Sequence, residues 1–159
     1  MSVQKGDRAP DFSLKDKDGQ EVGLSSFRGQ WVVLYFYPRD NTAGCTQEAR
    51  DFTERMAEFE KKEAVIIGIS PDSEKSHARF AEKHGLSVLL LSDPDHKALE
   101  SYGVWRLKKM AGREYMGVIR STFLIDPEGV VRDIWDKVRV KNHAEEVRER
   151  LCTFVSNGE

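Results

Sequence analysis

The chain has 159 residues, of which 39% are hydrophobic and 33% are charged, and its formal net charge is −2. This size and composition are typical of one globular domain, here residues 1–159, and they exclude a fibrous or largely disordered protein. A near-neutral charge balance gives no general attraction to nucleic acid or to an anionic membrane, so neither is an expected partner.

The start of the sequence has no hydrophobic segment that resembles a secretory signal, and the longest strongly hydrophobic run, residues 31–37, is too short to cross a bilayer. We therefore expect a cytoplasmic protein. Its two cysteines, Cys45 and Cys152, are too few for a disulfide scaffold. They could be core residues, one long-range disulfide, or reactive groups.

Hydrophobic periodicity predicts several strands. They are residues 11–14, 21–24, 31–37, 64–69, 88–91, 121–125 and 130–135. The first two form an N-terminal β-hairpin around a polar turn, and the last two form a second hairpin around Asp126-Pro-Glu-Gly129. The continuous hydrophobic runs between them suit central strands that are buried on both faces.

Helical periodicity lies between these strands. The predicted helices are residues 43–61, residues 73–84 with Gly85 as the C-cap, a short helix starting at Asp93-Pro94, and residues 142–155. Strands that alternate with helices predict an α/β domain with a partly parallel sheet. The closing hairpin adds antiparallel strands, so we expect a central mixed β-sheet flanked by helices.

The junction after the first central strand carries the strongest functional signal. A short loop follows the strand, and Cys45 lies in the first turn of the next helix. Free backbone N–H groups and the positive end of the helix dipole stabilise a thiolate over a thiol there. Thr42 is near enough for its hydroxyl to share the pocket, and Pro38 would restrict the loop and shield one side.

Arg120 is the second candidate because it immediately precedes the strand predicted at residues 121–125. A guanidinium at the mouth of a central strand could reach the sheet edge where Cys45 lies and bind a polar oxygen substrate. The competing interpretation is a solvated charge at a strand end, and spacing alone does not decide between them.

These residues resemble a known family. Pro38, Thr42 and Cys45 match the peroxiredoxin pattern of proline, three residues, threonine, two residues and cysteine. The segments 36–49, 6–12, 68–72 and 108–126 resemble the bacterioferritin comigratory protein (PrxQ-like thiol peroxidase) subfamily, in the same order along the chain. The resemblance extends from about residue 3 to residue 151.

The resemblance implies a thioredoxin-like fold and the thiol-dependent reduction of hydrogen peroxide or organic hydroperoxides, without a metal or an organic cofactor. Cys45 would be the peroxidatic cysteine, and it would become a sulfenic acid. Thr42 would bond the sulfur and the peroxide, Pro38 would shield the thiolate, and Arg120 would be the active-site arginine. The backbone N–H groups of Gly44 and Cys45 would help to hold the peroxide oxygens.

The sequence departs from this subfamily at the resolving cysteine. Many members carry it five residues after the first cysteine, where this chain has Arg50, and others carry it in the next helix, which has no cysteine here. Two routes remain. An external thiol such as thioredoxin, glutaredoxin or a small thiol reduces the sulfenic acid in a one-cysteine cycle, or Cys152 acts as an atypical resolving residue. The flank of Cys152 lacks the C-terminal resolving motif, which favours the one-cysteine cycle.

Other interpretations have less support. A thiol–disulfide oxidoreductase favours Cys-x-x-Cys, but Thr42 occupies the first position. A redox sensor would need a partner surface that no segment suggests. His77 and His84 lack partners at a metal-ligand spacing. The basic residues of segment 106–113 indicate a solvated loop rather than a dock for an acidic partner. We expect a monomer or a weak homodimer.

Overall fold

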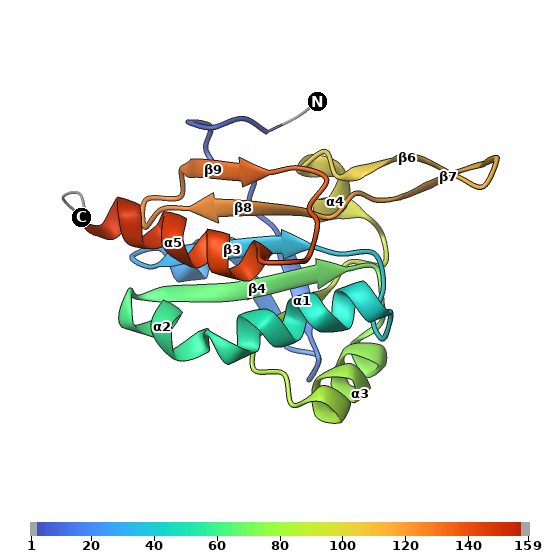
Figure 1. The fold of residues 1–159 in the computed structure, drawn as a ribbon, viewed down its shortest axis with the longest axis horizontal. Helices are drawn as coiled ribbons and strands as arrows, with labels where there is room; N and C mark the ends of the chain where they lie inside the picture. The colour runs from blue at the N-terminus through green and yellow to red at the C-terminus, as the bar shows by residue number, and fades with distance from the viewer. Residues whose placement is uncertain (1–2, 157–159) are drawn as a thin grey trace.

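The computed structural model describes residues 3–156, which form a seven-stranded sheet with helices on both faces (Figure 1). In spatial order, the strands are β2 (Glu21–Gly23), β1 (Ser13–Asp16), β5 (Leu89–Ser92), β4 (Ala64–Ser70), β3 (Trp31–Phe36), β8 (Ser121–Ile125) and β9 (Val131–Trp135). Strands β3, β4 and β5 run parallel, and the outer pairings are antiparallel. The mixed sheet and the N-terminal hairpin predicted from the sequence are therefore confirmed.

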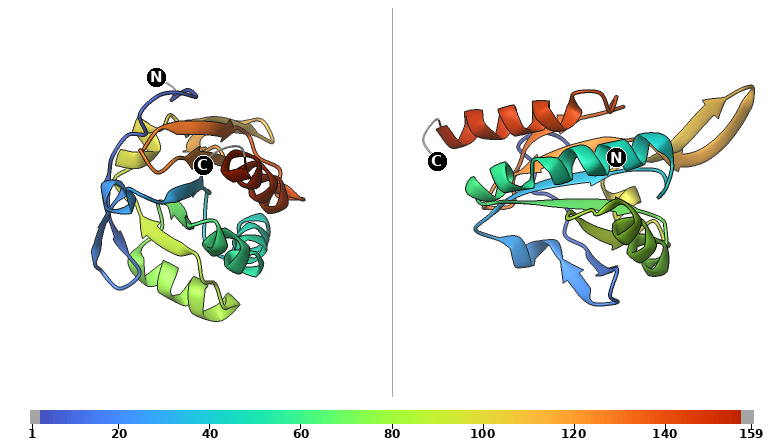
Figure 2. Two further views of the ribbon diagram at one scale, coloured as in Figure 1. Left: turned by 90° about the vertical axis from the view of Figure 1, so that its left-hand side faces the viewer. Right: turned by 60° about the horizontal axis from the view of Figure 1, so that its bottom comes forward.

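The helices divide between the two faces of the sheet. Helices α1 (Ala43–Glu54), α2 (Met56–Lys61), α3 (Glu74–His84) and α5 (His143–Ser156) supply buried residues to one hydrophobic core. The short helix α4 (Lys97–Ser101) and the 3-10 turn η1 (Leu24–Phe27) supply the other core. Figure 2 shows α1 and α5 side by side on one face of the sheet.

Strand β3 shows why its sequence is hydrophobic without interruption. Its side chains alternate between the two cores, with Val33 and Tyr35 in the first and Val32 and Leu34 in the second. All six residues of the strand are buried. A central strand covered on both faces needs apolar side chains in both directions, which removes the alternation of a half-exposed strand.

The helix predicted over residues 43–61 is broken in two at Arg55, so that prediction is corrected. The guanidinium of Arg55 donates to the carbonyl of Asp51 at 2.9 Å. In a continuous helix, this carbonyl would accept from the backbone N–H of Arg55. That N–H instead donates to Phe52 at 3.1 Å. Arg55 also bonds Glu145 on α5 at 3.1 Å, so a contact distant in sequence stabilises the break.

The short helix also begins later than predicted. Helix α4 starts at Lys97 rather than at Pro94, because the carboxylate of Asp93 accepts hydrogen bonds from the backbone N–H groups of Lys97 and Leu99, each at 2.9 Å. Helix α3 starts one residue after the first residue of its predicted range, because Ser73 is its N-cap, and it ends as expected with Gly85 in the left-handed conformation.

The basic segment predicted to be a loop is instead an antiparallel hairpin. Strands β6 (Trp105–Met110) and β7 (Arg113–Val118) pair only with each other and project from the body of the molecule (Figure 1), and we call them the hairpin arm. In the described part of the chain, residues 3–156, no helix is long and apolar enough to cross a bilayer.

Candidate active site

Cys45 is the third residue of α1, and its side chain is only 1% exposed. Thr42 is the N-cap residue of this helix and has an extended backbone. The backbone N–H of Thr46 donates to the carbonyl of Thr42 at 2.9 Å, and it is the first N–H of α1 to bond within the helix. The N–H groups of Gly44 and Cys45 precede it and are among the free donors of the first turn.

The structure brings Arg120 to Cys45. Nη2 of Arg120 donates to Sγ of Cys45 at 3.2 Å, and Nη1 donates to Oε1 of Glu48 at 2.6 Å. Strand β8 pairs antiparallel with β3 so that Ser121 lies opposite Phe36. The residue before β8 is therefore placed at the carboxyl end of β3, where the loop to α1 begins.

Glu48 is a site residue that the sequence analysis missed. It lies three residues after Cys45, so both project from the same face of α1. Its side chain is 1% exposed, which is unusual for a carboxylate unless the group is paired. A charged residue on the buried face of an amphipathic helix was the available signal, but its partner is 72 residues away in the sequence.

Burial and charge act in opposite directions on this ion pair. Burial raises the pKa of Glu48 to about 7, although the attraction and hydrogen bond of Arg120 oppose that rise. Burial alone would lower the pKa of Arg120, but the negative charges of Glu48 and Cys45 outweigh it and raise the pKa. Oε2 of Glu48 is buried and has no hydrogen-bond partner. Arg120 therefore stays a cation held between Glu48 and the sulfur.

Thr42, Pro38 and Gly44 lie close to Cys45 in the sequence and have different surroundings. The hydroxyl of Thr42 donates to the carbonyl of Arg39 at 2.9 Å, so in this arrangement it is engaged with the loop rather than with Cys45. Pro38 is half-buried in the same loop. A Cβ on Gly44 would lie 3.3 Å from Nη2 of Arg120, so a glycine here lets the guanidinium approach the helix closely.

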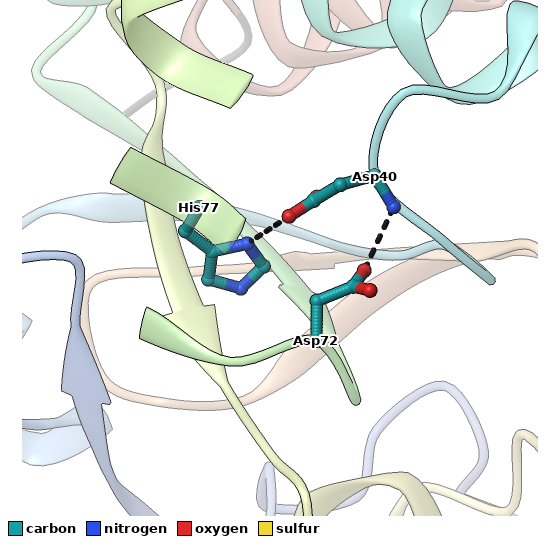
Figure 3. A group of neighbouring side chains, drawn as sticks. All are labelled: Asp40, Asp72 and His77. Atoms are coloured by element: carbon teal, nitrogen blue, oxygen red, sulfur yellow. Dashed lines mark hydrogen bonds and ion pairs between the residues drawn. The ribbon is translucent and has the colours of Figure 1, made fainter. Parts of the chain in front are cut away.

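A buried cluster holds the loop between β3 and α1 (Figure 3). Nδ1 of His77 lies 2.7 Å from Oδ2 of Asp40, and the backbone N–H of Asp40 donates to Oδ2 of Asp72 at 2.7 Å. The hydroxyls of Tyr37 and Ser76 also donate to Asp40, at 2.6 and 2.7 Å. The loop that leads to Cys45 is therefore fixed to α3 through the carboxylate of Asp40 and to the segment after β4 through the carboxylate of Asp72.

The hydrogen bonds place the protons of this cluster. Nε2 of His77 lies 2.9 Å from the carbonyl of Leu91, which can only accept, so Nε2 carries a proton. A second proton lies between Nδ1 of His77 and Oδ2 of Asp40, which are 2.7 Å apart. Asp40, Asp72 and His77 have ligand atoms within 4.8 Å of one another, a spacing that a metal ion could use. Their hydrogen bonds to one another and to the loop occupy those atoms instead.

Cys152 lies far along the sheet from Cys45. It is half-buried on α5, where Nη1 of Arg148 approaches its sulfur at 3.7 Å, and neither cysteine forms a disulfide. Phe154, two residues later, stacks on Trp31 at the start of β3. Cys45 lies instead at the carboxyl end of that strand, and the views agree that α1 begins and α5 ends at opposite ends of the molecule (Figures 1 and 2).

Comparison with known proteins places this geometry in a family. The AhpC/TSA family model matches residues 5–134 of the chain. Peroxiredoxin Bcp of Bacillus subtilis is 51% identical over 151 residues, which cover 95% of this chain and 96% of that protein.

Solved structures agree with these matches. PrxQ of Xylella fastidiosa superposes with a TM-score of 0.92 at 35% identity, covering 97% of this chain and 98% of that one. The bacterioferritin comigratory protein of Xanthomonas campestris, described for its alkyl peroxide reduction activity, superposes with a TM-score of 0.87 at 40% identity, covering 91% and 92%. The expected thioredoxin-like fold is confirmed. The chain therefore belongs to the AhpC/TSA family and is a peroxiredoxin of the Bcp/PrxQ group, a thiol-dependent peroxidase that uses a peroxide and a thiol reductant.

Proposed function

We propose that this peroxidase works through Cys45 as its nucleophile. The thiolate attacks one oxygen of the peroxide, an S–O bond forms and the O–O bond breaks. The sulfur is oxidised to a sulfenic acid, and the departing oxygen takes a proton and leaves as water or an alcohol. The observation that carries this proposal is the 3.2 Å contact between Arg120 and the sulfur in the first turn of α1.

The charges around the sulfur suit this reaction. The reaction needs an ionised sulfur before the attack and stabilisation of negative charge on the leaving oxygen during it. Arg120 supplies a cation for both, and the free N–H groups of Gly44 and Cys45 would hold the peroxide oxygens. Thr42 would turn its hydroxyl from Arg39 to the bound peroxide, and Pro38 would keep water from one side of the thiolate.

Glu48 acts in this proposal as a positioning residue. Its carboxylate bonds Nη1 of Arg120 at 2.6 Å, which leaves Nη2 directed at the sulfur. A guanidinium held at two points loses little freedom when the peroxide binds, so its charge is already aligned in the transition state. Glu48 does not contact the reacting atoms.

The cycle closes with a thiol from another molecule. Arg50 occupies the position of the usual resolving cysteine and is exposed, and Cys152 is at the other end of the sheet. The external thiol attacks the sulfenic sulfur, an S–S bond forms and water leaves. A second thiol then cleaves this mixed disulfide and returns the thiol of Cys45. A reducing cytoplasm would supply such thiols.

The test compares the two cysteines as matched variants. Cys45→Ser should abolish the consumption of hydrogen peroxide in the presence of dithiothreitol, and Cys152→Ser should leave it unchanged. Intact mass after one equivalent of peroxide without reductant should show one added oxygen on the wild type. Peroxide consumption by Cys45→Ser at the wild-type rate would refute the nucleophile.

The same mass measurement decides between the two resolving routes. A loss of two hydrogens in the wild type that disappears in Cys152→Ser would establish an intramolecular disulfide and overturn the one-cysteine cycle.

A further inference from the structure

The hairpin arm presents exposed apolar side chains. The large hydrophobic residues that are exposed in the described part of the chain, residues 3–156, all lie on it. They are Leu107 (54% exposed), Met110 (61%), Tyr115 (42%) and Met116 (49%). Leu107 and Met116 lie directly opposite each other in the strand register, so they form one apolar pair on one face of the arm. An exposed apolar cluster of this kind marks an interaction surface.

The arm is also basic in an acidic chain. It carries four basic residues and one acidic residue, a net charge of +3, in a chain whose net charge is −2. Lys109 pairs with Glu114 at 3.5 Å and Arg106 pairs with Asp136. Within residues 3–156 no ion pair involves Arg113 or Lys108, and Arg113 is exposed close to the tip. The chemistry of the arm therefore favours a partner with an apolar surface and acidic residues.

The base of the arm lies at the active site. Strand β7 ends at Val118, and Arg120, which contacts the sulfur of Cys45, follows two residues later. Figures 1 and 2 show the arm projecting from the end of the molecule at which α1 begins. A strand of six residues extends about 20 Å, so a protein that binds the arm would lie beside the mouth of the site. A small-molecule thiol would not need a docking surface of this size to reach the site.

We propose that the hairpin arm is the docking surface for a protein dithiol that reduces Cys45, a partner with an apolar and acidic surface around its reactive thiol. The inference rests on the proposed one-cysteine cycle, in which the reductant is another molecule. One thiolate of the partner attacks the sulfenic sulfur, forming the S–S bond and releasing water. Its second thiol then displaces Cys45, so that the partner leaves as a disulfide with the two electrons supplied.

The experiment measures peroxide turnover with two reductants, reduced bacterial thioredoxin as the protein dithiol and dithiothreitol as the small thiol. Replacing the apolar pair in Leu107→Ser/Met116→Ser should raise the KM for thioredoxin about tenfold, as expected when interface anchors are removed. The KM for dithiothreitol should change much less. Oxidation of Cys45 by peroxide is followed separately, so failure of the peroxidase reaction itself is distinguishable.

Two charge-reversal variants, one on the arm and one away from it, provide a matched comparison. Arg113→Glu should raise the KM for thioredoxin several-fold at low ionic strength and less at high salt, because screening weakens charge attraction. Lys61→Glu makes the same change in charge at the exposed end of α2, away from the arm, and should have no effect.

Three outcomes would overturn the proposal. The first is an equal change in KM for both reductants in the arm variants. The second is a wild-type enzyme that thioredoxin reduces no faster than dithiothreitol at equal thiol concentration. The third is a wild-type dimer, seen by sedimentation, that the arm variants dissociate while their KM for thioredoxin stays unchanged, because the arm would then bind a second copy of this chain.

Discussion

Arg120 connects Glu48 to Cys45 and is the residue next to the sulfur on which the proposed chemistry depends. It faces Glu48 with one guanidinium nitrogen and Cys45 with the other. The two contacts have different consequences. The first concerns the stability of the fold because Glu48 is buried, and the second concerns the reaction because the sulfur is the proposed nucleophile.

Replacing Arg120 by Gln should lower the second-order rate of Cys45 oxidation by hydrogen peroxide about 10²- to 10³-fold, the usual cost of removing a charge-stabilising donor. Stopped-flow competition against a reference thiol measures this rate. Arg50→Gln, an exposed arginine on the same helix, serves as the control and should react like the wild type. A loss of less than threefold in Arg120→Gln would contradict the role proposed for the guanidinium.

Glu48 should make stability depend on pH. Its pKa is raised from 4.5 to about 7, so the folded protein keeps a proton that the unfolded chain has already lost. This carboxyl therefore contributes stability that is full below about pH 4.5 and is lost as the pH rises to about 7. Glu48→Gln should remove that contribution. Urea unfolding of both proteins from pH 4.5 to 7.5 measures the difference.

The wild type must be compared with Glu48→Gln because His143 makes stability depend on pH in the opposite direction. Burial, helped by the charge of Arg120, lowers the pKa of His143 from 6.5 to about 4, so its contribution is lost as the pH falls below 6.5. A difference between wild type and Glu48→Gln that does not change with pH would show that Glu48 has an ordinary pKa.

At the scale of elements, the loop between β3 and α1 is held by a buried hydrogen-bonded pair. His77 on α3 is 0% exposed and Asp40 in the loop is 6% exposed, and the pair connects the loop to a second helix. A buried hydrogen bond gives modest net stability, but the loss of one partner leaves the other buried and unsatisfied. The position of Cys45 thus depends on a contact outside its own helix.

His77→Leu should lower the free energy of unfolding by about 1–3 kcal/mol, because Asp40 would lose a buried hydrogen-bond partner. Adding Asp40→Asn to His77→Leu should restore part of the lost free energy of unfolding. Chemical denaturation at pH 7 measures this for both single variants and the double variant. His84→Leu, on the same helix but only half-buried, is the control and should cost less than about 1 kcal/mol. Additive losses in the double variant would exclude a coupled pair.

The sequence predicted the elements that have a clear hydrophobic pattern. Strand β3 and helix α3 lie within a few residues of their predicted bounds. The strand is buried on both faces and the helix on one, and each kind of burial leaves a recognisable pattern of hydrophobic residues. The break at Arg55 could not be predicted, since it depends on a partner 90 residues away. The hairpin arm was missed because a two-stranded hairpin that no other strand covers buries few side chains and leaves no alternation to detect.

The site was predicted as far as the local sequence determines it. Cys45 and Arg120 were both selected, and the structure brings them together, but the distance between them follows only from the pairing of β3 with β8. Glu48 was missed because a charged residue on the buried face of a helix indicates that a partner exists but not which one, and Arg120 is 72 residues away in the sequence. The hydroxyl of Thr42 was expected near the sulfur and is bonded to Arg39 in this arrangement.

At the scale of the whole molecule, the sheet separates two hydrophobic cores, and the outer part of the arm belongs to neither. Only its base is anchored, with Trp105 against His96 at a ring distance of 3.9 Å and Val118 in the second core. A part of the chain that adds little to the cores can change without loss of the fold.

Replacing residues 107–116 with Asn-Gly, a two-residue turn that joins Arg106 to its register partner Gly117, should therefore preserve the fold. We expect the free energy of unfolding to change by less than about 1 kcal/mol, because the removed side chains are mostly exposed. Urea denaturation followed by circular dichroism measures this change. A loss above about 3 kcal/mol would show that the arm supports a core after all.

The burial of Cys45 has a kinetic consequence. In the proposed cycle, the two half-reactions would differ in their access to the sulfur. Cys45 is 1% exposed, so we expect a peroxide of a few atoms to be less obstructed than a thiol carried by another protein. We expect reduction by a protein thiol to need a local opening of the first turn of α1, and that opening would then limit turnover once peroxide is abundant.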